Sequence, residues 1–558
     1  MNDPAIRSVS RREVTIYSSE ITGTIHIFFH DLAVPQRMTP ATATYTSAQP
    51  AQLHQSQPRR LGRAWRHWGL LALVLLALAV RLPGVNRPLV GHFATKNVTY
   101  AMIARNWVRG RSSACYPAMD CMTGGERGWH LLEFPVASYL AGVGWSCCGG
   151  SLDVWGRATS MTFSVGSVLV LFWLVRRWHG LSAACGAAVM LALAPVAIIF
   201  GQSFMLESSV AFFSIVTFAC LDQWLAKRRH RWLALAAAGF SLLLLTKIYM
   251  LVLILPLTVM AWRELHRHSR RAMRRHWIEF VVAAVLATAP ALAWCANVLR
   301  VSATDSPLSQ RVFYSIRQSA EVNQASLRLL SSPAFYAKLL DDLTGPVLTP
   351  LGFVLCLTGL MNPACRRHLV WLAAMAVLVM ALPAKFYGIL YYDVVLLPPL
   401  CILAGLGWQR VAERLRPSLA ATAGFVAIAL LLSMRYTVGP AFLTPEEDRG
   451  VTAAAAALGE LADVEEPVLT MHGWCTDLLY YCDRPGWGVS PDDPRLPDRF
   501  ALALRQGTRW CVATNLDVLD RSPLALAELA EWTVVREGDD FRIYRLDSRN
   551  AGHVFKGP

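Results

Sequence analysis

The sequence predicts an all-α polytopic membrane protein with about eleven transmembrane helices, juxtamembrane helices and a small C-terminal α/β domain. Of its 558 residues, 54% are hydrophobic and only 16% are charged, and the mean hydropathy is +0.37. This composition, with repeated apolar runs of spanning length, is typical of an integral membrane protein. The last part of the chain instead alternates short strand patterns with helix patterns, which indicates a separate α/β domain.

The net charge of +15 does not indicate a nucleic-acid-binding protein. Lysines and arginines lie in short clusters beside apolar runs, such as KRRHR at 227–231 and HRHSRRAMRRH at 266–276. Such clusters mark the cytoplasmic ends of membrane helices. The sequence has no glycine-rich phosphate loop, zinc-type Cys/His spacing or nucleic-acid motif, so we expect no nucleic-acid partner.

Residues 1–64 are predicted to be a disordered cytoplasmic leader, because they are rich in Ser, Thr, Ala, Pro and Gln and show no sustained periodicity. The apolar run Trp68–Val80 follows four arginines. We therefore expect a first span, or signal anchor, with its N-terminus inside.

A polar interval, Arg81–Pro135, separates this run from the next apolar region. Within it, Tyr100, Ile103 and Trp107 recur at helical spacing, so Thr95–Arg109 is predicted to be an amphipathic helix on the membrane surface. The Cys, Pro and Gly residues that follow indicate irregular chain. A polar segment of this length on a membrane protein is more often functional than a bare connection.

The next apolar stretch, Phe134–Cys148, is short for a span. If it crossed the membrane, the later basic clusters would fall outside, so it is predicted to be non-spanning.

A single long helix through Lys247 is an alternative to the two short predicted spans on either side of that residue. Residues 299–345 form a second outer loop. The further predicted spans are Arg157–Val175, Leu181–Gly201, Met205–Leu225, Trp232–Thr246, Ile248–Trp262, Trp277–Val298, Pro346–Leu360, Leu369–Leu382, Tyr391–Gly407 and Leu419–Arg435.

The tail, residues 438–558, is predicted to be an extracytoplasmic α/β domain. Helix patterns cover Ala453–Leu461 and Leu524–Trp532, PVLTMHG and RWCVATN are strand patterns, and WTVVREGDDFRIYRL encloses a Gly-Asp-Asp turn between two strands. Most of the thirteen cysteines are isolated in the sequence. Two pairs in polar chain, Cys115 with Cys121 and Cys475 with Cys482, form disulfides if they face an oxidising compartment, and the bonded and free states both stay open.

Several polar residues are predicted to gather at the outer membrane boundary. Ionisable groups at such depth are costly unless they are paired or functional. Each has an ordinary explanation: a helix end for Glu207, lipid-phosphate contact for Lys247 and an aromatic belt for the tyrosines. His92 and His130 read as loop histidines, and Asp120 and Glu126 as solvated loop charges. Convergence on one side favours a site, whose members are Glu133, Glu207, Lys247, Tyr391, Tyr392 and Asp393.

A series of segments occurs in a characteristic order: AMIARNW, LLEFPVASYLAGVGW, LDVWGRATS, ALAPVAIIFGQSFMLESS, LLLLTKIYMLVL and YYDVVLLPPLCILAGLG. In this order and spacing, residues 68–435 resemble the family 39 glycosyltransferases, which include the protein O-mannosyltransferase and aminoarabinose transferase types. The resemblance implies a membrane glycosyltransferase domain over 65–437, with an outer loop at 83–133. It also implies transfer of a sugar, with inversion, from a polyprenyl-phosphate donor to a glycan, lipid or protein acceptor outside the cytoplasmic (inner) membrane. The sequence requires no cofactor and leaves a divalent metal open.

The resemblance also implies roles for individual residues. Glu133 matches a carboxylate before the loop-end proline, and Lys247 matches a basic residue suited to the lipid phosphate. Many members have Asp-Glu where this chain has Lys96-Asn97, and that Asp is taken as the base. The base is then Glu133, His92 or Asp120, or Lys96 binds phosphate in a rearranged site, or activity is lost; we expect an active enzyme with Glu133 or His92 as base. The predicted catalytic residues are Glu133, His92 and Glu207, and the predicted substrate-binding residues are Lys96, Arg105, Lys247, Tyr391 and Tyr392.

Two other functions compete with the enzyme. A transporter or flippase of lipid-linked sugar usually shows internal repeats and polar residues at the bilayer midplane, whereas the polar residues here gather at one boundary. A non-catalytic membrane scaffold is supported mainly by Lys96-Asn97. Sugar transfer would distinguish the enzyme from the scaffold.

Overall fold

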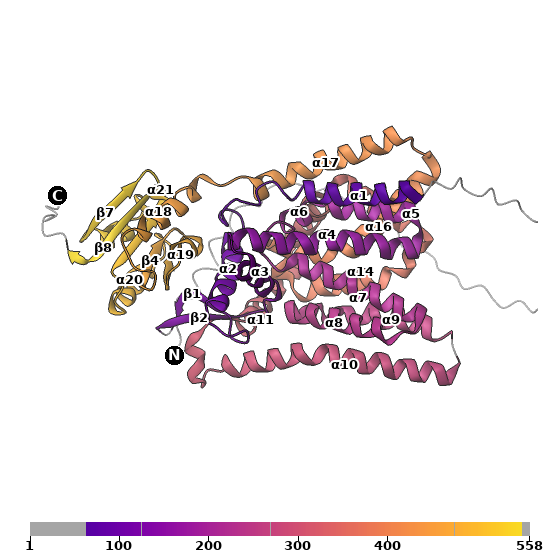
Figure 1. The fold of residues 1–558 in the computed structure, drawn as a ribbon, viewed down its shortest axis with the longest axis horizontal. Coiled ribbons are helices and arrows are strands. Elements are labelled where there is room, and N and C mark those ends of the chain that lie inside the picture. Colours follow the sequence, from indigo (N-terminus) through magenta and orange to yellow (C-terminus); the bar gives the residue numbers. More distant parts are fainter. Residues whose placement is uncertain (1–62, 124, 268, 474, 550–558) are drawn as a thin grey trace, which may run out of the picture. The chain divides into compact units, whose positions relative to one another are not determined.

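The computed structural model describes residues 63–549, except 124, 268 and 474. The predicted leader, residues 1–64, therefore lies almost wholly outside the described residues. The described chain is a bundle of helices with a mixed β-sheet at one end, which we call the sheet end (Figure 1).

Apolar helices make up most of the bundle. Among the described residues, six are long and apolar enough to cross a membrane, or seven if a pair bent by 106° at Leu348 counts as one span, and shorter apolar helices accompany them. The predicted fold class is confirmed in these coarse terms, while the number eleven stays a prediction. The helices of the bundle are α1 Arg63–Ala79, α4 Leu152–His179, α5 Leu181–Leu193, α6 Pro195–Ile199, α7 Glu207–Lys227, α8 His230–Thr246, α9 Ile254–Leu265, α10 Arg270–Val301, α12 Pro333–Asp342, α13 Thr349–Leu360, α14 Leu369–Ala381, α16 Leu397–Leu415 and α17 Leu419–Phe442.

The backbone defines two uncertain segments of the bundle. The stretch predicted to be non-spanning forms α3 Val136–Cys148, which is 13 residues long, and its position relative to the membrane stays a prediction. At Lys247 the chain adopts extended backbone (φ −147°), so α8 ends and a 3₁₀ helix, η2 Ile248–Leu253, begins. The single long helix through Lys247 is therefore excluded.

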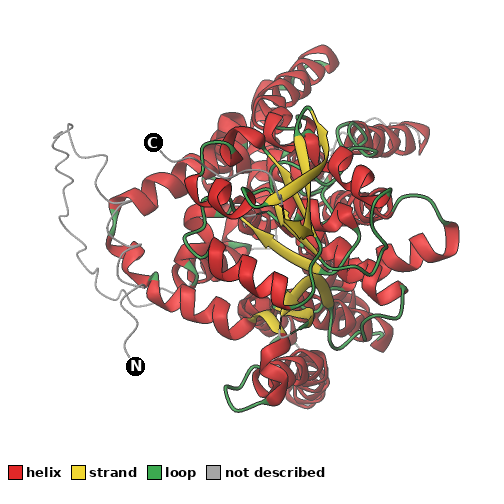
Figure 2. Cartoon of the chain, turned by 90° about the vertical axis from the view of Figure 1, so that its left-hand side faces the viewer, coloured by secondary structure: helices red, strands yellow, loops and turns green. Residues whose placement is uncertain are grey.

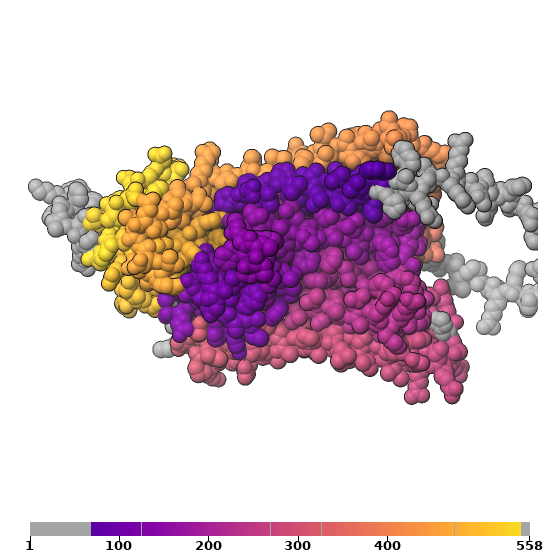
Figure 3. Space-filling view, viewed as in Figure 1, coloured from indigo at the N-terminus to yellow at the C-terminus, as the bar shows by residue number. Residues whose placement is uncertain are grey.

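Small residues allow the central helices to approach closely. A Cβ on Gly359 of α13 would lie 2.0 Å from the carbonyl oxygen of Leu403 on α16, and one on Gly407 would lie 2.0 Å from that of Leu355. Glycine at these positions brings the two backbones into contact, as is common in membrane helix pairs. On one flank, α1 packs beside α17 through an apolar cluster that includes Leu76 and Met434 (Figure 3).

Basic residues gather at the end opposite to the sheet. Arg177 of α4 and Arg367 both lie within 4 Å of Asp222 on α7, at 2.8 and 3.7 Å. Arg263 of α9 lines a cavity with the same aspartate. These arginines belong to the basic clusters on which the sequence argument rested, and the side of the membrane stays a prediction.

The sheet is assembled from three distant segments. Its order is β3-β2-β1-β5-β4-β6-β8-β7, and β1 pairs in parallel with β5 at Cys121 and Gly486. Figure 2 shows the strands crossing in front of the helices at the sheet end. The strands are β1 Ala118–Thr123, β2 Glu126–Leu131, β3 Val312–Ser315, β4 Val468–Met471, β5 Gly486–Val489, β6 Trp510–Thr514, β7 Trp532–Gly538 and β8 Phe541–Arg549.

In the tail, the predicted strands at β4, β6, β7 and β8 are found. Its helices are α18 Gly450–Gly459, α19 Asp477–Cys482, α20 Leu496–Arg505, α21 Leu516–Leu519 and α22 Pro523–Leu529. The predicted boundary of a tail domain at 438 stays a prediction, and the sheet that carries the tail also takes strands from both polar loops.

The first polar loop differs from its prediction in two ways. The chain after Arg109 is irregular as predicted only at 110–117, and from Ala118 it forms the hairpin β1–β2. The sequence signal for this hairpin was the pair Gly124-Gly125 between two six-residue runs. The predicted surface helix exists as α2 Ala94–Val108, but eleven of its residues are buried. It is covered by α3, β1 and α19 and so does not present a polar face to water.

Of the two states left open for the cysteine pairs, the structure has the free one. All thirteen cysteines lie in the described part of the chain and are free thiols. The Cys475 thiol instead accepts a hydrogen bond from the Thr95 hydroxyl at 3.2 Å, which connects the tail to the start of α2.

Candidate functional site

Three residues from distant segments meet at the sheet end of the bundle. The Lys247 Nζ lies 2.5 Å from Glu133 Oε1 and 3.4 Å from Glu207 Oε1. All three side chains are at most 4% exposed. We call Glu133, Glu207 and Lys247 the carboxylate–lysine cluster.

Local structure places each member of this cluster. Glu207 is the first residue of α7, where the positive end of the helix dipole stabilises a carboxylate. Lys247 lies at the break after α8. The backbone N–H of Phe134, next to Glu133, donates to the Leu245 carbonyl at 3.0 Å, which holds the end of the first polar loop against the end of α8.

Further donors surround Glu133. The Tyr100 hydroxyl donates to Oε2 at 3.2 Å, the Lys96 Nζ lies 3.9 Å from Oε1 and the His130 Nε2 lies 3.6 Å from Oε2. Burial alone would raise the pKa of Glu133, but Lys247, Lys96 and His130 outweigh it and hold that pKa well below its usual range. Burial lowers the pKa of His130, so its ring is neutral at pH 7. Glu133 is therefore an ionised carboxylate in a buried site.

Aromatic rings and another lysine complete the surroundings. The Lys247 Nζ lies 5.3 Å from the ring centre of Tyr392 and 6.0 Å from that of Tyr391, both in the 3₁₀ helix η7 Leu390–Leu396. Lys385, in α15 Pro383–Gly388, lies 5.7 Å from the Tyr392 ring centre. Sequence reasoning missed Lys385, although an ionisable residue in the apolar stretch ALPAKFYGIL is a signal of function.

A cavity of about 330 Å³ adjoins the carboxylate–lysine cluster. Its wall combines the charged residues with apolar and amide side chains from α11 Ile316–Ala325 and from η2. The lining includes Glu133, Lys247, Tyr249, Ile316, Asn323, Leu382, Lys385 and Tyr392. Positive charge, a carboxylate and apolar surface thus meet in one space, which suits a ligand with a phosphate and a hydrocarbon part.

The neighbouring residues Lys96 and Asn97 make different contacts. Lys96 turns toward Glu133, as given above. The Asn97 side chain instead accepts a hydrogen bond from the Phe204 backbone N–H at 2.6 Å and donates to the Phe93 carbonyl at 3.0 Å. Asn97 therefore connects the start of α2 to the chain that leads into α7.

Three predicted residues do not join the cluster. Arg105 lies 2.6 Å from Asp120 and 3.1 Å from Asp483, and so joins α2 to β1 and α19. Asp120 is fully buried and not a solvated loop charge, because Arg105, Asn106 and Arg127 all contact its carboxylate. His92 is exposed, and its ring lies beside that of the adjacent Phe93, with 6.4 Å between the ring centres.

His130 corrects a second prediction. It is not an ordinary loop histidine but a buried residue of β2 beside Glu133, with its ring stacked on Tyr314 of β3. Its position could not be recognised without the hairpin and its pairing with β3. Glu126, in contrast, is exposed as predicted and pairs with Arg311.

Residues 133–294 match the family model described as dolichyl-phosphate-mannose-protein mannosyltransferase. This interval contains all three members of the carboxylate–lysine cluster. The match confirms the predicted resemblance to this glycosyltransferase family. No curated protein matches the chain.

The fold is similar to those of solved membrane proteins. The chain aligns with ArnT from Cupriavidus metallidurans bound to undecaprenyl phosphate, with a TM-score of 0.54 and 16% identity over 86% of this chain and 98% of that one. The oligosaccharyltransferase from Archaeoglobus fulgidus, tethered to an acceptor peptide containing the NVT sequon, aligns with a TM-score of 0.50 and 12% identity over 85% and 73% of the two chains. Together, the family match and the shared fold indicate a membrane glycosyltransferase.

Proposed function

We propose that this chain transfers a sugar from a polyprenyl-phosphate carrier to an acceptor on the outer side of the cytoplasmic membrane. The observation that carries the proposal is the buried contact of Lys247 with Glu133 and Glu207 beside a cavity lined partly by apolar residues. Buried ionisable groups among apolar helices are retained for a function. Transfer of a sugar from a lipid phosphate needs a carboxylate as base and cationic groups that stabilise the leaving phosphate. The undecaprenyl phosphate bound by the similar ArnT supports this class of donor.

Lysines bind the donor phosphate in this proposal. Lys247 and Lys385 line the cavity, and Lys96 and Lys247 lie within 4 Å of Glu133. Ammonium groups are suitable point-charge ligands for phosphate. When the phosphate occupies Lys247, the contact of that lysine with Glu133 weakens. Lys96 thus supplies positive charge where many relatives of this type have a carboxylate.

Glu133 serves as the general base. It takes the proton of the acceptor hydroxyl as that oxygen attacks the anomeric carbon, and the bond from this carbon to the phosphate oxygen breaks. The extra negative charge on the leaving lipid phosphate is stabilised by the lysines. Attack opposite to the leaving phosphate inverts the anomeric carbon. We assign the base to Glu133 and not to His92, because Glu133 lines the cavity and His92 is exposed.

The remaining predicted residues support the reaction. Glu207 holds Lys247 in place from the start of α7. Tyr391 and Tyr392 present rings beside Lys247, which suits contact with a sugar or a prenyl unit. Arg105 acts as a positioning residue, because its guanidinium joins α2 to Asp120 and Asp483.

The test is transfer of label from a panel of radiolabelled polyprenyl-phosphate sugars by the purified protein in lipid. Membranes that contain native acceptors are supplied to the reaction. Wild type is compared with Glu133→Gln and Lys247→Ala, with Glu126→Gln as the matched control because Glu126 is exposed on the same hairpin. We expect the first two variants to lose about 10²–10⁴-fold in rate and the control to retain it.

Two results would contradict the proposal. If no donor in the panel gives transfer by wild type, the chain is a transporter or scaffold. If transfer occurs but Glu133→Gln retains the rate, the base lies elsewhere, and the same assay on His92→Gln then tests the alternative.

A further inference from the structure

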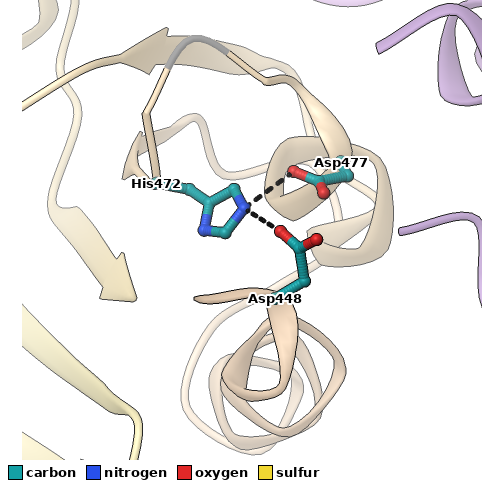
Figure 4. Close-up of side chains that lie close together, drawn as sticks. All are labelled: Asp448, His472 and Asp477. Carbon is teal, nitrogen blue, oxygen red and sulfur yellow. Dashed lines mark hydrogen bonds and ion pairs between the residues drawn. The ribbon is translucent and has the colours of Figure 1, made fainter. Parts of the chain in front are cut away.

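We propose that Asp448, His472 and Asp477 form a binding site for a divalent transition metal ion, with Zn²⁺ as the best fit. The site lies in the sheet-end tail and is separate from the carboxylate–lysine cluster. Figure 4 shows the three side chains pointing toward one another, with both carboxylates facing the same nitrogen of the imidazole.

The donor atoms have the spacing of metal ligands. The His472 Nε2 lies 2.9 Å from Asp448 Oδ1 and 3.5 Å from Asp477 Oδ1, and one ligand atom from each residue falls within 4.8 Å of the others. Ligand atoms bound to one tetrahedral Zn²⁺ at about 2 Å lie roughly 3.3 Å apart. Imidazole nitrogen and carboxylate oxygen are ordinary zinc ligands, and three of them leave a fourth position for water.

The two buried carboxylates of this site leave negative charge unbalanced unless a cation binds. Asp477 has no exposed surface, and no N–H or O–H group among the described residues donates to its Oδ2, while the weakly polar Cys475 thiol lies close to this carboxylate. Asp448 and His472 are also buried. Two buried carboxylates face one imidazole, whose single positive charge can balance only one of them. A divalent cation balances both, with the imidazole neutral.

Neighbouring groups orient the ligands. The other ring nitrogen of His472, Nδ1, lies 2.7 Å from the hydroxyl of Thr514, a fully buried residue of β6, so Nε2 faces the carboxylates. The Leu478 backbone N–H donates to Asp477 Oδ1 at 2.8 Å. Such outer contacts typically hold metal ligands in the orientation that binding requires.

The metal would join three elements of the chain. Asp448 ends the 3₁₀ turn η8 Glu446–Asp448, which follows α17, His472 follows β4, and Asp477 begins α19. The next turn of α19 donates two tyrosine hydroxyl hydrogen bonds to Asp153 of α4, at 2.6 and 2.7 Å. The ion would thus hold α19 between the last membrane helix and the sheet.

Metal content of the full-length protein tests this proposal. The purified chain is stripped with a chelator and reloaded with ZnCl₂, and bound zinc is measured by mass spectrometry and by competition with a chromogenic chelator. We compare wild type with Asp477→Asn and Asp448→Asn, using Asp520→Asn as the matched control because Asp520 pairs with Arg542 on the surface of the same tail.

We expect one zinc ion per chain in wild type and in the control. The affinity should be weakened in both site variants by at least about 10–100-fold, the loss typical of removing an outer contact of a ligand. Zinc should also raise the unfolding temperature of wild type more than that of Asp477→Asn, with circular dichroism confirming that this variant is folded. Wild type that binds no zinc would overturn the proposal, as would a folded site variant with unchanged affinity. Because zinc content is the readout, the result is independent of sugar transfer.

Discussion

Replacing Lys247 by methionine should destabilise the protein by about 3–5 kcal/mol. The Nζ lies 2.5 Å from Glu133 and 3.4 Å from Glu207, and all three side chains are buried. With an effective dielectric constant of about 20, the two gross attractions are roughly 7 and 5 kcal/mol. Methionine retains the apolar stem, so the loss is mainly electrostatic.

The net loss is smaller than the gross attraction for two reasons. The lysine also regains hydration in the unfolded state, which offsets much of the attraction. In addition, Lys96 lies 3.9 Å from Glu133 and still balances part of its charge. A partner substitution should therefore rescue stability: we expect Glu133→Gln with Lys247→Met to be less destabilised than the sum of the single variants, with a coupling of about 1–3 kcal/mol.

The assay is the free energy of unfolding from denaturant titration of the protein in mixed micelles. Arg317→Met is the control, since Arg317 makes an exposed ion pair with Glu321, and it should change stability by less than about 0.5 kcal/mol. The reasoning is refuted if Lys247→Met falls within about 1 kcal/mol of wild type, or if the two single effects simply add.

Three further predictions concern pH, packing and the tail. The folded-state pKa of Glu133 is lowered, so the stability that its carboxylate contributes is present above the ordinary pKa of 4.5 and is lost as the pH falls through the lower folded-state value. Acid should therefore lower the unfolding temperature of wild type more than that of Glu133→Gln. Gly156→Ala should cost about 1–3 kcal/mol, because its Cβ would lie 2.0 Å from the Phe204 ring, while Gly424→Ala, with open space, should be neutral in the same titration. Asp153→Asn weakens the hydrogen bonds from the two α19 tyrosines, so amide hydrogen exchange in α19 should become faster, and unchanged exchange would contradict this contact.

The sequence was sufficient to locate the apolar helices, because their position is marked by local patterns of apolar and charged residues. Apolar periodicity and charge clusters locate helices, because the bilayer imposes length and sidedness on each segment. Once the helices are located, residues at the helix ends on one side of the membrane are expected to lie at the same membrane boundary. Glu133, Glu207 and Lys247 were expected at one boundary for this reason, and the structure brings them into direct contact.

The features that were missed depend on contacts between distant segments. The strands of the sheet are four to nine residues long, and β5, GWGV, is too short and too rich in glycine to be distinguished from a loop. Asp120 and His130 looked like loop residues because their burial comes from neighbouring elements: Asp120 is paired with Arg105 of α2, and His130 packs against β3. The local sequence around a residue does not show whether segments from elsewhere in the chain will bury it.

The pairing of β1 with β5 also has a consequence for biogenesis. Cys121 of β1 meets Gly486, about 365 positions later in the chain, so the inner edge of the hairpin has no strand to pair with until nearly the whole protein has been synthesised. During that interval, β1 exposes an unpaired edge on a chain already passing through the membrane. A truncation before β5 should therefore yield a chain whose first loop is a target for proteases or chaperones, even though every residue of the carboxylate–lysine cluster is present. Pairing of β1 with β5 would then protect only full-length molecules from proteases and chaperones.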